Sequence, residues 1–378
     1  MPHPHLKDTL PPSDPPTDPN IPKWQRDQFV AHAEAGAGCA PRDHARDLVV
    51  LTADGLYCPA GDFHIDPWRP VARAVITHGH GDHARQGNGE YHAVHEGMPI
   101  LRWRLGEQVY VPRAYGEVFQ LGGAHVSFHS AGHVLGSCQV RIEVDGEVWV
   151  VSGDYKRQPD PTCAPFEVVR CDTFITEATF GLPVYRWPDT PDVAREFVAW
   201  REHCAERGET ALLLCYALGK AQRLLAELGR VTDRPALLHG AIHAGVQVYR
   251  DCGIDMLKTR TIGEDIARSR GGRSDYAGEL VLAPPSAAGS PWLRRFKHVQ
   301  TGFASGWMRI RGNRRRRNYD RGFVVSDHAD WPALLRTVRE TGASRVIATH
   351  GNTDAIVRAL CESGIAAEAF RTTYGGED

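Results

Sequence analysis

The chain has 378 residues, a formal net charge of −2 and a hydrophobic content of 42%. This composition is typical of globular proteins with one large or two moderate domains, and it excludes fibrous and wholly disordered chains. No apolar stretch is long enough to span a membrane, and the start lacks the pattern of a signal peptide, so we expect a cytoplasmic protein with no membrane partner. The nine cysteines are scattered without a C-x-x-C pair, which predicts neither a disulfide framework nor a cysteine zinc site.

Three regions of different pattern follow one another along the chain. Residues 1–45 are Pro-rich and poor in apolar residues, which predicts a disordered extension. Residues 46–189 hold short β-branched runs such as VARAVIT, CQVRIEV and GEVWVVSG, which predict a sheet-rich segment. In 190–308 strand-like and helix-like segments alternate, as in ALLLCY followed by AQRLLAELGR, which predicts a parallel sheet with covered faces. Because 309–378 returns to strands that end in histidines, we expect 190–308 to be inserted into a domain made of 46–189 and 309–378.

A dense histidine cluster, HGHGDH, follows the apolar run that ends at Thr77. His78 and His80 are two residues apart, so on extended backbone both rings lie on the same side and can share one metal ion. Asp82 and His83 point elsewhere, which suits a second, adjacent ion. Gly79 and Gly81 are expected to permit the tight backbone path around the metal. Histidine with carboxylate favours zinc or manganese, and a run of surface histidines rarely has this spacing.

Two ions need more ligands than this stretch supplies. His133, in SAGHVLGS, and Asp154, in VVSGDYKR, both lie in turns beside predicted strands. We expect them to complete the cluster. Asp154 is the candidate bridging carboxylate, because two neighbouring cations need a shared anion to limit their repulsion.

These motifs, in this order, resemble the metal-binding motifs of the metallo-β-lactamase fold. The resemblance implies an α/β fold in which an αββα sandwich binds the metals. It also implies that Asp66, in FHIDPW, orients a ligand from outside the metal shell.

Three later stretches resemble the nucleic-acid-processing β-CASP branch of that fold. They are FITEATFG with Glu177, FVVSDHADW with His328, and VIATHGNTD with His350, and an α/β insertion lies between the first two. The resemblance implies that 190–308 is the β-CASP domain and that His350 completes the second metal site. Stretches such as GLYCPAGDFHIDPWRP and EATFGLPVYRWP are most similar to bacterial DNA-ligase-associated exonucleases. That similarity implies association with an ATP-dependent DNA ligase and a helicase in DNA repair.

The resemblance predicts a two-metal phosphodiesterase. One ion is held by His78, His80, His133 and Asp154, and the other by Asp82, His83, Asp154 and His350. His328 is the expected general acid, Glu177 is expected to orient it, and Asp82 is counted with them among the candidate catalytic residues. The structural alternative for Glu177 is an ordinary acid at a strand end.

Basic residues are the candidate contacts to nucleic acid. The stretch WMRIRGNRRRRNYDRG, residues 307–322, holds seven arginines against one aspartate. Its alternative is a solvated hairpin turn. Lys220 is expected at a helix N-terminus, where backbone N–H groups favour a phosphate. The candidate residues are Lys220, Arg311, Arg314, Arg315, Arg316 and Arg317.

Four functions are therefore compared. A DNA exonuclease is the first choice, and an RNA-processing nuclease of the same branch is the alternative. His350 is typical of RNA-cutting members, whereas GDYKRQPDP resembles DNA-repair members. A small-molecule hydrolase would need neither the insertion nor the set Glu177, His328 and His350. A catalytically silent binding module would not need a complete ligand set.

Overall fold

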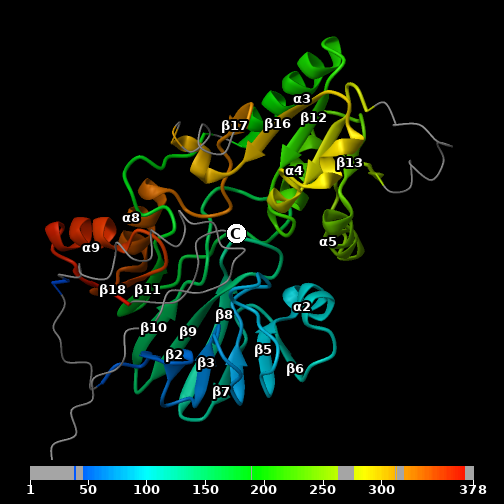
Figure 1. The fold of residues 1–378 in the computed structure, drawn as a ribbon. Helices are drawn as coiled ribbons and strands as arrows, with labels where there is room; N and C mark the ends of the chain where they lie inside the picture. Colours follow the sequence, from blue (N-terminus) through cyan, green and yellow to red (C-terminus); the bar gives the residue numbers. More distant parts are fainter. Residues whose placement is uncertain are drawn as a thin grey trace, which may run out of the picture. The chain divides into compact units, whose positions relative to one another are not determined.

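A computed structural model describes residues 38–39, 46–188, 190–262, 276–310, 312 and 319–370 (Figure 1). The predicted extension, residues 1–45, lies outside this part except for Gly38 and Cys39. None of the helices described in these ranges has the length and apolar character needed to cross a membrane.

Two mixed sheets form the first part of the fold. The first has the order β1-β2-β3-β4-β5-β6, and the second has the order β19-β18-β11-β10-β9-β8-β7. Strands β1 to β3 and β7 to β10 pair antiparallel, whereas the remaining neighbours in both sheets are parallel. The strands of the first sheet are β1 (Val50–Thr52), β2 (Gly55–Cys58), β3 (Phe63–Ile65), β4 (Arg73–Val75), β5 (Glu90–Val94) and β6 (Tyr110–Arg113). Those of the second are β7 (Val118–Leu121), β8 (Ala124–Ser130), β9 (Cys138–Val144), β10 (Glu147–Val151), β11 (Thr173–Glu177), β18 (Arg345–Thr349) and β19 (Ala366–Ala369).

The hydrophobic core shows how these two sheets are layered. Phe63 and Val75 of the first sheet share one buried cluster with Phe128 and Trp149 of the second, so the two sheets pack face to face. The outer face of the first sheet is covered by α2 (Met98–Leu105), and that of the second by α8 (Trp331–Thr341) and α9 (Thr353–Glu362). The predicted αββα sandwich is therefore confirmed.

A third sheet, entirely parallel, lies between β11 and β18 in the sequence. Its order is β14-β13-β15-β12-β16-β17. Helices α3, α4 and α5 pack on one face through residues such as Phe197, Leu224 and Val246. The elements are α3 (Thr190–Glu206), β12 (Thr210–Leu214), α4 (Lys220–Leu228), β13 (Ala236–Leu238), α5 (Gly240–Asp251), β14 (Thr259–Thr261), β15 (Leu280–Ala283), β16 (Val299–Ala304) and β17 (Arg321–Phe323). Short 3₁₀ turns span His95–Gly97, Pro285–Ala287, Pro291–Arg295 and Gly306–Arg309.

The division into domains stays a proposal, and the sheet pairing bears on its second boundary. Strand β17 lies beyond residue 308, where we placed the end of the insertion, yet it pairs with β16 of the third sheet. Sheet membership therefore favours a boundary after Phe323.

The glycines of the histidine stretch have a different role from the one expected. Neither Gly79 nor Gly81 has a positive φ. A Cβ at Gly79 would lie 2.5 Å from a methyl carbon of Ile100 on α2. Close approach to α2, rather than an unusual backbone conformation, therefore explains glycine at position 79.

The cysteines correct one expectation. Cys39 and Cys361 form a disulfide with a Cα–Cα distance of 6.0 Å, although no disulfide framework was predicted. The bond joins the segment before β1 to α9, and the backbone N–H of Cys39 also donates to the Ala367 carbonyl of β19. A separation of 322 residues gives no sequence signal for such a pair. The other seven cysteines are free, so the correction is a single bond.

Candidate metal centre

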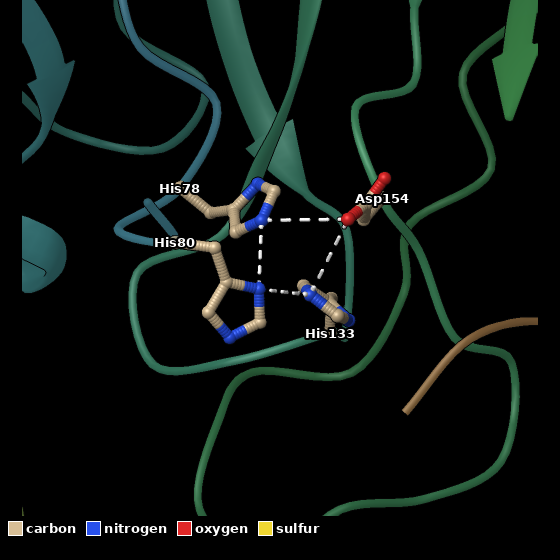
Figure 2. Close-up of side chains that lie close together, drawn as sticks. All are labelled: His78, His80, His133 and Asp154. Carbon is tan, nitrogen blue, oxygen red and sulfur yellow. Dashed lines mark hydrogen bonds and ion pairs between the residues drawn. The ribbon is translucent and has the colours of Figure 1, made fainter. Parts of the chain in front are cut away.

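The first donor group is built from three loops at strand ends. His78 and His80 follow β4, His133 lies in the turn between β8 and β9, and Asp154 follows β10. Figure 2 shows the three rings and the carboxylate converging on one point. The loops that follow β4, β8 and β10 all lie at the same end of the sandwich. Motifs that are far apart in the sequence therefore meet here.

The spacing of these four donors fits a single metal ion. His80 Nδ1 lies 3.1 Å from both His78 Nε2 and His133 Nε2. Asp154 Oδ2 lies 3.5 Å from His78 Nε2 and 3.8 Å from His133 Nε2. Ligands held about 2.0–2.2 Å from a tetrahedral ion are about 3.3–3.6 Å apart. The donors thus have nearly the separation that a bound ion requires.

Burial keeps the imidazoles of this group in the form that binds metal. It lowers the pKa of His80 and that of His133 to about 4, and it lowers the pKa of His78 well below the ordinary value. At neutral pH these rings are uncharged, so each offers a lone pair to a cation.

A second donor group shares Asp154 with the first. His83, Asp154 and His350 offer ligand atoms within 4.8 Å of one another, and His83 Nε2 lies 3.4 Å from Asp154 Oδ2. The carboxylate of Asp82 lies 3.7 Å from the same nitrogen, with its side chain 32% exposed. The structure thus brings all the predicted metal-site residues to one place, with Asp154 between the two groups.

Carboxylates dominate the electrostatics of the second group. Burial disfavours a charged His83, but Asp154, Asp82 and Asp66 together raise the pKa of this imidazole well above its ordinary value. Burial likewise disfavours a charged Asp154, yet His83 and His328 hold the pKa of that carboxyl well below its usual range. The group therefore attracts positive charge, which is the chemistry of a cation site.

Asp66 supports the centre from outside. Its Oδ2 lies 2.7 Å from His83 Nδ1, and its Oδ1 accepts the backbone N–H of Thr77 at 2.8 Å. Asp66 and His350 both have positive φ, at 46° and 58°, a conformation that residues other than glycine rarely adopt. Such backbone is typical of positions where a side chain must face a functional site.

A histidine–carboxylate pair flanks the centre. His328 Nδ1 lies 2.8 Å from Glu177 Oε2, and Glu177 Oε1 accepts the backbone N–H of Tyr155 at 2.7 Å. Burial raises the pKa of Glu177. Ligand atoms of His328 and Glu177 come within 4.8 Å of Asp154, and the His328 ring centroid is 4.7 Å from that of His133. The pair can therefore hold a proton beside the donor groups.

The predicted nucleic-acid contacts are not gathered at the centre in the same way. Lys220 begins α4 as expected, but its side chain is fully buried, with Nζ 3.4 Å from Asp327 Oδ2. This favours a structural role for Lys220. Arg311 and Arg314 to Arg317 lie outside the described residues.

The sequence reasoning missed residues that act through the backbone. Leu218 and Asp327 offer carbonyl oxygens to His80 and His133. The sequence offered one indication of these contacts, which is that Asp327 stands directly beside His328 in SDHAD.

Comparison with known proteins agrees with this geometry. The chain is 30% identical over 333 residues, 87% of its length, to a protein of Opitutus terrae named "Probable DNA ligase". It is 27% identical over 220 residues, 48% of its length, to the protein "Endoribonuclease YSH1" of Mycosarcoma maydis. The homologues that it matches include β-CASP nucleases of the metallo-β-lactamase fold. No family model matches it.

A solved structure resembles the chain in fold. It is that of a protein of unknown function from Enterococcus faecalis, with a TM-score of 0.52, 11% identity and 80% of each chain covered. The chain spans 31% of the length of the Opitutus terrae protein and 24% of that of the Mycosarcoma maydis protein.

Proposed function

We propose that the chain is a metal-dependent phosphodiesterase that acts as a DNA exonuclease in DNA repair. The observation that carries this proposal is the pair of donor groups sharing Asp154, next to the His328–Glu177 pair. A small-molecule hydrolase does not need such an acid pair beside its metals, and a binding module needs neither feature.

The proposed metal ligands divide into two sets that share one residue. His78, His80, His133 and Asp154 would hold one divalent ion, and Asp82, His83, Asp154 and His350 the other. When bound, zinc or manganese in such a pair lowers the pKa of a shared water and offsets charge on the scissile phosphate. The identity of the metal stays a prediction.

The chain's own residues supply the proton chemistry. His328 Nδ1 faces the Glu177 carboxylate, so the protonated ring carries its other N–H at Nε2, which is the proposed donor. Hydrolysis adds water across one P–O bond: the hydroxide goes to phosphorus, His328 Nε2 gives its proton to the departing sugar oxygen, and the proton lost by the water restores the charged ring. Glu177 positions the ring and stabilises its charged form. The products are one hydroxyl end and one phosphate end.

DNA is preferred as the substrate because most of the chain is similar to a segment of a protein named as a DNA ligase. The alternative is RNA processing, which the similarity to a named endoribonuclease and the presence of His350 both favour. Association with a DNA ligase and a helicase, and a cytoplasmic location, stay predictions.

The test compares matched strands of DNA and RNA. Purified chain is incubated with end-labelled single-stranded DNA, duplex DNA and RNA of one sequence, with Mn²⁺, Zn²⁺ or a chelator. Release of mononucleotides from linear DNA, with circular DNA left intact, is the expected result. Faster cleavage of RNA would replace DNA by the alternative.

Two variants tie the activity to this site. His80→Ala is expected to abolish cleavage, whereas His125→Ala removes an exposed histidine on β8 and should leave it unchanged. Equal activity of the two variants would refute the proposed centre.

A further inference from the structure

Two histidines of the first donor group contact backbone carbonyls of segments that lie outside the two sheets of the sandwich. His80 Nε2 lies 3.2 Å from the carbonyl oxygen of Leu218, and His133 Nδ1 lies 2.8 Å from that of Asp327. In each ring the other nitrogen is the one that faces the donor group. A carbonyl can only accept, so each contact fixes the tautomer that leaves the ligating nitrogen with its lone pair.

The Leu218 carbonyl belongs to the third-sheet region itself, whereas the Asp327 carbonyl belongs to the segment that joins the third sheet to α8 of the sandwich. Leu218 lies between β12 and α4, and Asp327 follows β17. The turn before α4 approaches the histidine closely. Gly219 has a φ of 83°, and a Cβ there would lie 2.5 Å from Val134 Cγ1 and 3.6 Å from His80 Nε2. Glycine is favoured here by the positive φ and by the close approach to Val134, the residue after the ligand candidate His133.

A buried charge network holds the second carbonyl in place. Asp327 Oδ1 accepts from Arg223 Nη1 at 2.9 Å, and Asp327 Oδ2 lies 3.4 Å from Lys220 Nζ. Arg223 Nη1 also donates to the Ser326 carbonyl at 2.6 Å. The side chains of Lys220, Arg223 and Asp327 are 6% exposed or less. Two residues of α4 therefore fix the position of the segment 326–328. This segment carries both His328 and the Asp327 carbonyl that contacts His133.

The network continues into the sandwich side of the molecule. Arg223 Nε lies 3.7 Å from Asp160 Oδ2, and the same oxygen lies 3.0 Å from Lys156 Nζ. Both residues follow closely after Asp154 in the chain. The start of α4 thus connects three segments that surround the first donor group.

We propose that the segment from Leu218 to Arg223, together with Asp327, is a positioning element for the metal ligands His80 and His133. It orients the two rings through the Leu218 and Asp327 carbonyls, so the third-sheet region controls how tightly the first donor group binds its ion. The proposal deepens the proposed function and rests on the first donor group being a metal site. It gives Lys220 and Arg223 a positioning role at the centre.

The experiment measures metal affinity rather than cleavage. A His350→Ala background weakens the second group, so that at limiting metal both Zn²⁺ competition with a chromophoric chelator and Co²⁺ absorption report the first group. In that background Asp327→Asn is expected to weaken Zn²⁺ binding by about tenfold to a hundredfold, the usual effect of losing a partner that orients a ligand. The Co²⁺ spectrum should change as well, because the ligand geometry changes.

A matched control separates positioning from ordinary stability. Glu279→Gln changes another charge contact of the third-sheet region, in which Glu279 lies 2.6 Å from Nη2 of the buried Arg201 and also pairs with Arg234 and Arg260, none of which is a metal donor. It should lower the melting temperature of the metal-free chain but leave Zn²⁺ affinity and the Co²⁺ spectrum unchanged. Equal loss of Zn²⁺ affinity in Asp327→Asn and Glu279→Gln would overturn the proposal.

A milder series covers the case in which Asp327→Asn fails to fold. Lys220→Met leaves the Arg223–Asp327 contact in place and is expected to weaken Zn²⁺ binding less than Asp327→Asn would, with Lys220→Arg restoring it. Unchanged affinity in Lys220→Met would contradict the proposal. If the His350→Ala background itself binds no Zn²⁺, the metal site of the proposed function fails. That result is distinct from the two outcomes that would overturn the positioning role alone.

Discussion

The two donor groups that share Asp154 differ in how they are enclosed. In the first, three of the four donors are buried and His80 is partly buried, and the rings of His80 and His133 each contact a backbone carbonyl, of Leu218 and Asp327 respectively. In the second, Asp82 lies at 3.7 Å from His83 and is one-third exposed. One centre therefore contains a preorganised site and a more accessible one. We expect the preorganised site to bind its metal ion tightly and the accessible site to bind more weakly.

The largest effect is expected from changing the one residue that both donor groups share. Asp154→Asn removes the carboxylate that both groups use, so both ions should be lost. Without their electrostatic stabilisation, worth several kcal/mol, cleavage should fall by about ten-thousandfold or more. Metal analysis after dialysis and a cleavage assay measure this. Retention of a full metal complement by Asp154→Asn would contradict the shared role.

The proton donor is expected to be separable from both metal groups. His328→Ala should lower the rate of cleavage by about a hundredfold to ten-thousandfold, which is the usual contribution of a general acid, while metal content stays the same. Single-turnover kinetics and metal analysis on one sample check both statements. Metal content falling as far as in His80→Ala would refute this division of labour.

Removing one ligand from each group compares the metal affinities of the two groups directly. His350→Ala should retain about one tightly bound ion per chain, whereas His80→Ala should retain less than one, because it opens the enclosed group. Cleavage by His350→Ala is expected to recover partly when Mn²⁺ is raised. If the two variants retain the same metal and respond alike to Mn²⁺, the groups are equivalent.

The smallest effect concerns the arginine run outside the described residues. Changing Arg311 and Arg314 to Arg317 to glutamine should weaken binding to single-stranded DNA and flatten its salt dependence, by about 0.7 per lost phosphate contact in the log–log slope. Fluorescence anisotropy over a salt series measures the slope. The control changes five exposed arginines elsewhere to glutamine: Arg69, Arg85, Arg195, Arg336 and Arg358. An equal change of slope in both variants would show that the run has no special role.

The metal-site residues were predictable because their chemistry is local. HGHGDH carries its own spacing, and His133 and Asp154 stand in turns between strands that the hydrophobic pattern predicts. The sandwich followed from the order of the motifs, which identified the fold family. Strands such as β6, with sequence YVPR, escaped prediction because a proline interrupts a short partly exposed run.

What could not be predicted depends on contacts between distant segments. Lys220 was placed correctly at a helix N-terminus, but its burial against Asp327 comes from how α4 packs. The Leu218 carbonyl is a backbone group, and any residue type would supply it. The disulfide between Cys39 and Cys361 likewise depends on where the segment before β1 lies. Side-chain identity is readable from sequence, whereas backbone partners and long-range pairs are not.

The most direct test of the central claim is anomalous diffraction from a crystal of the chain soaked in Mn²⁺, recorded where manganese scatters strongly. Two anomalous peaks are expected, with Asp154 between them. One peak should lie among His78, His80 and His133, and the other beside His83 and His350, with the stronger peak in the first group. Peaks elsewhere in the molecule, or none within bonding distance of Asp154, would contradict it.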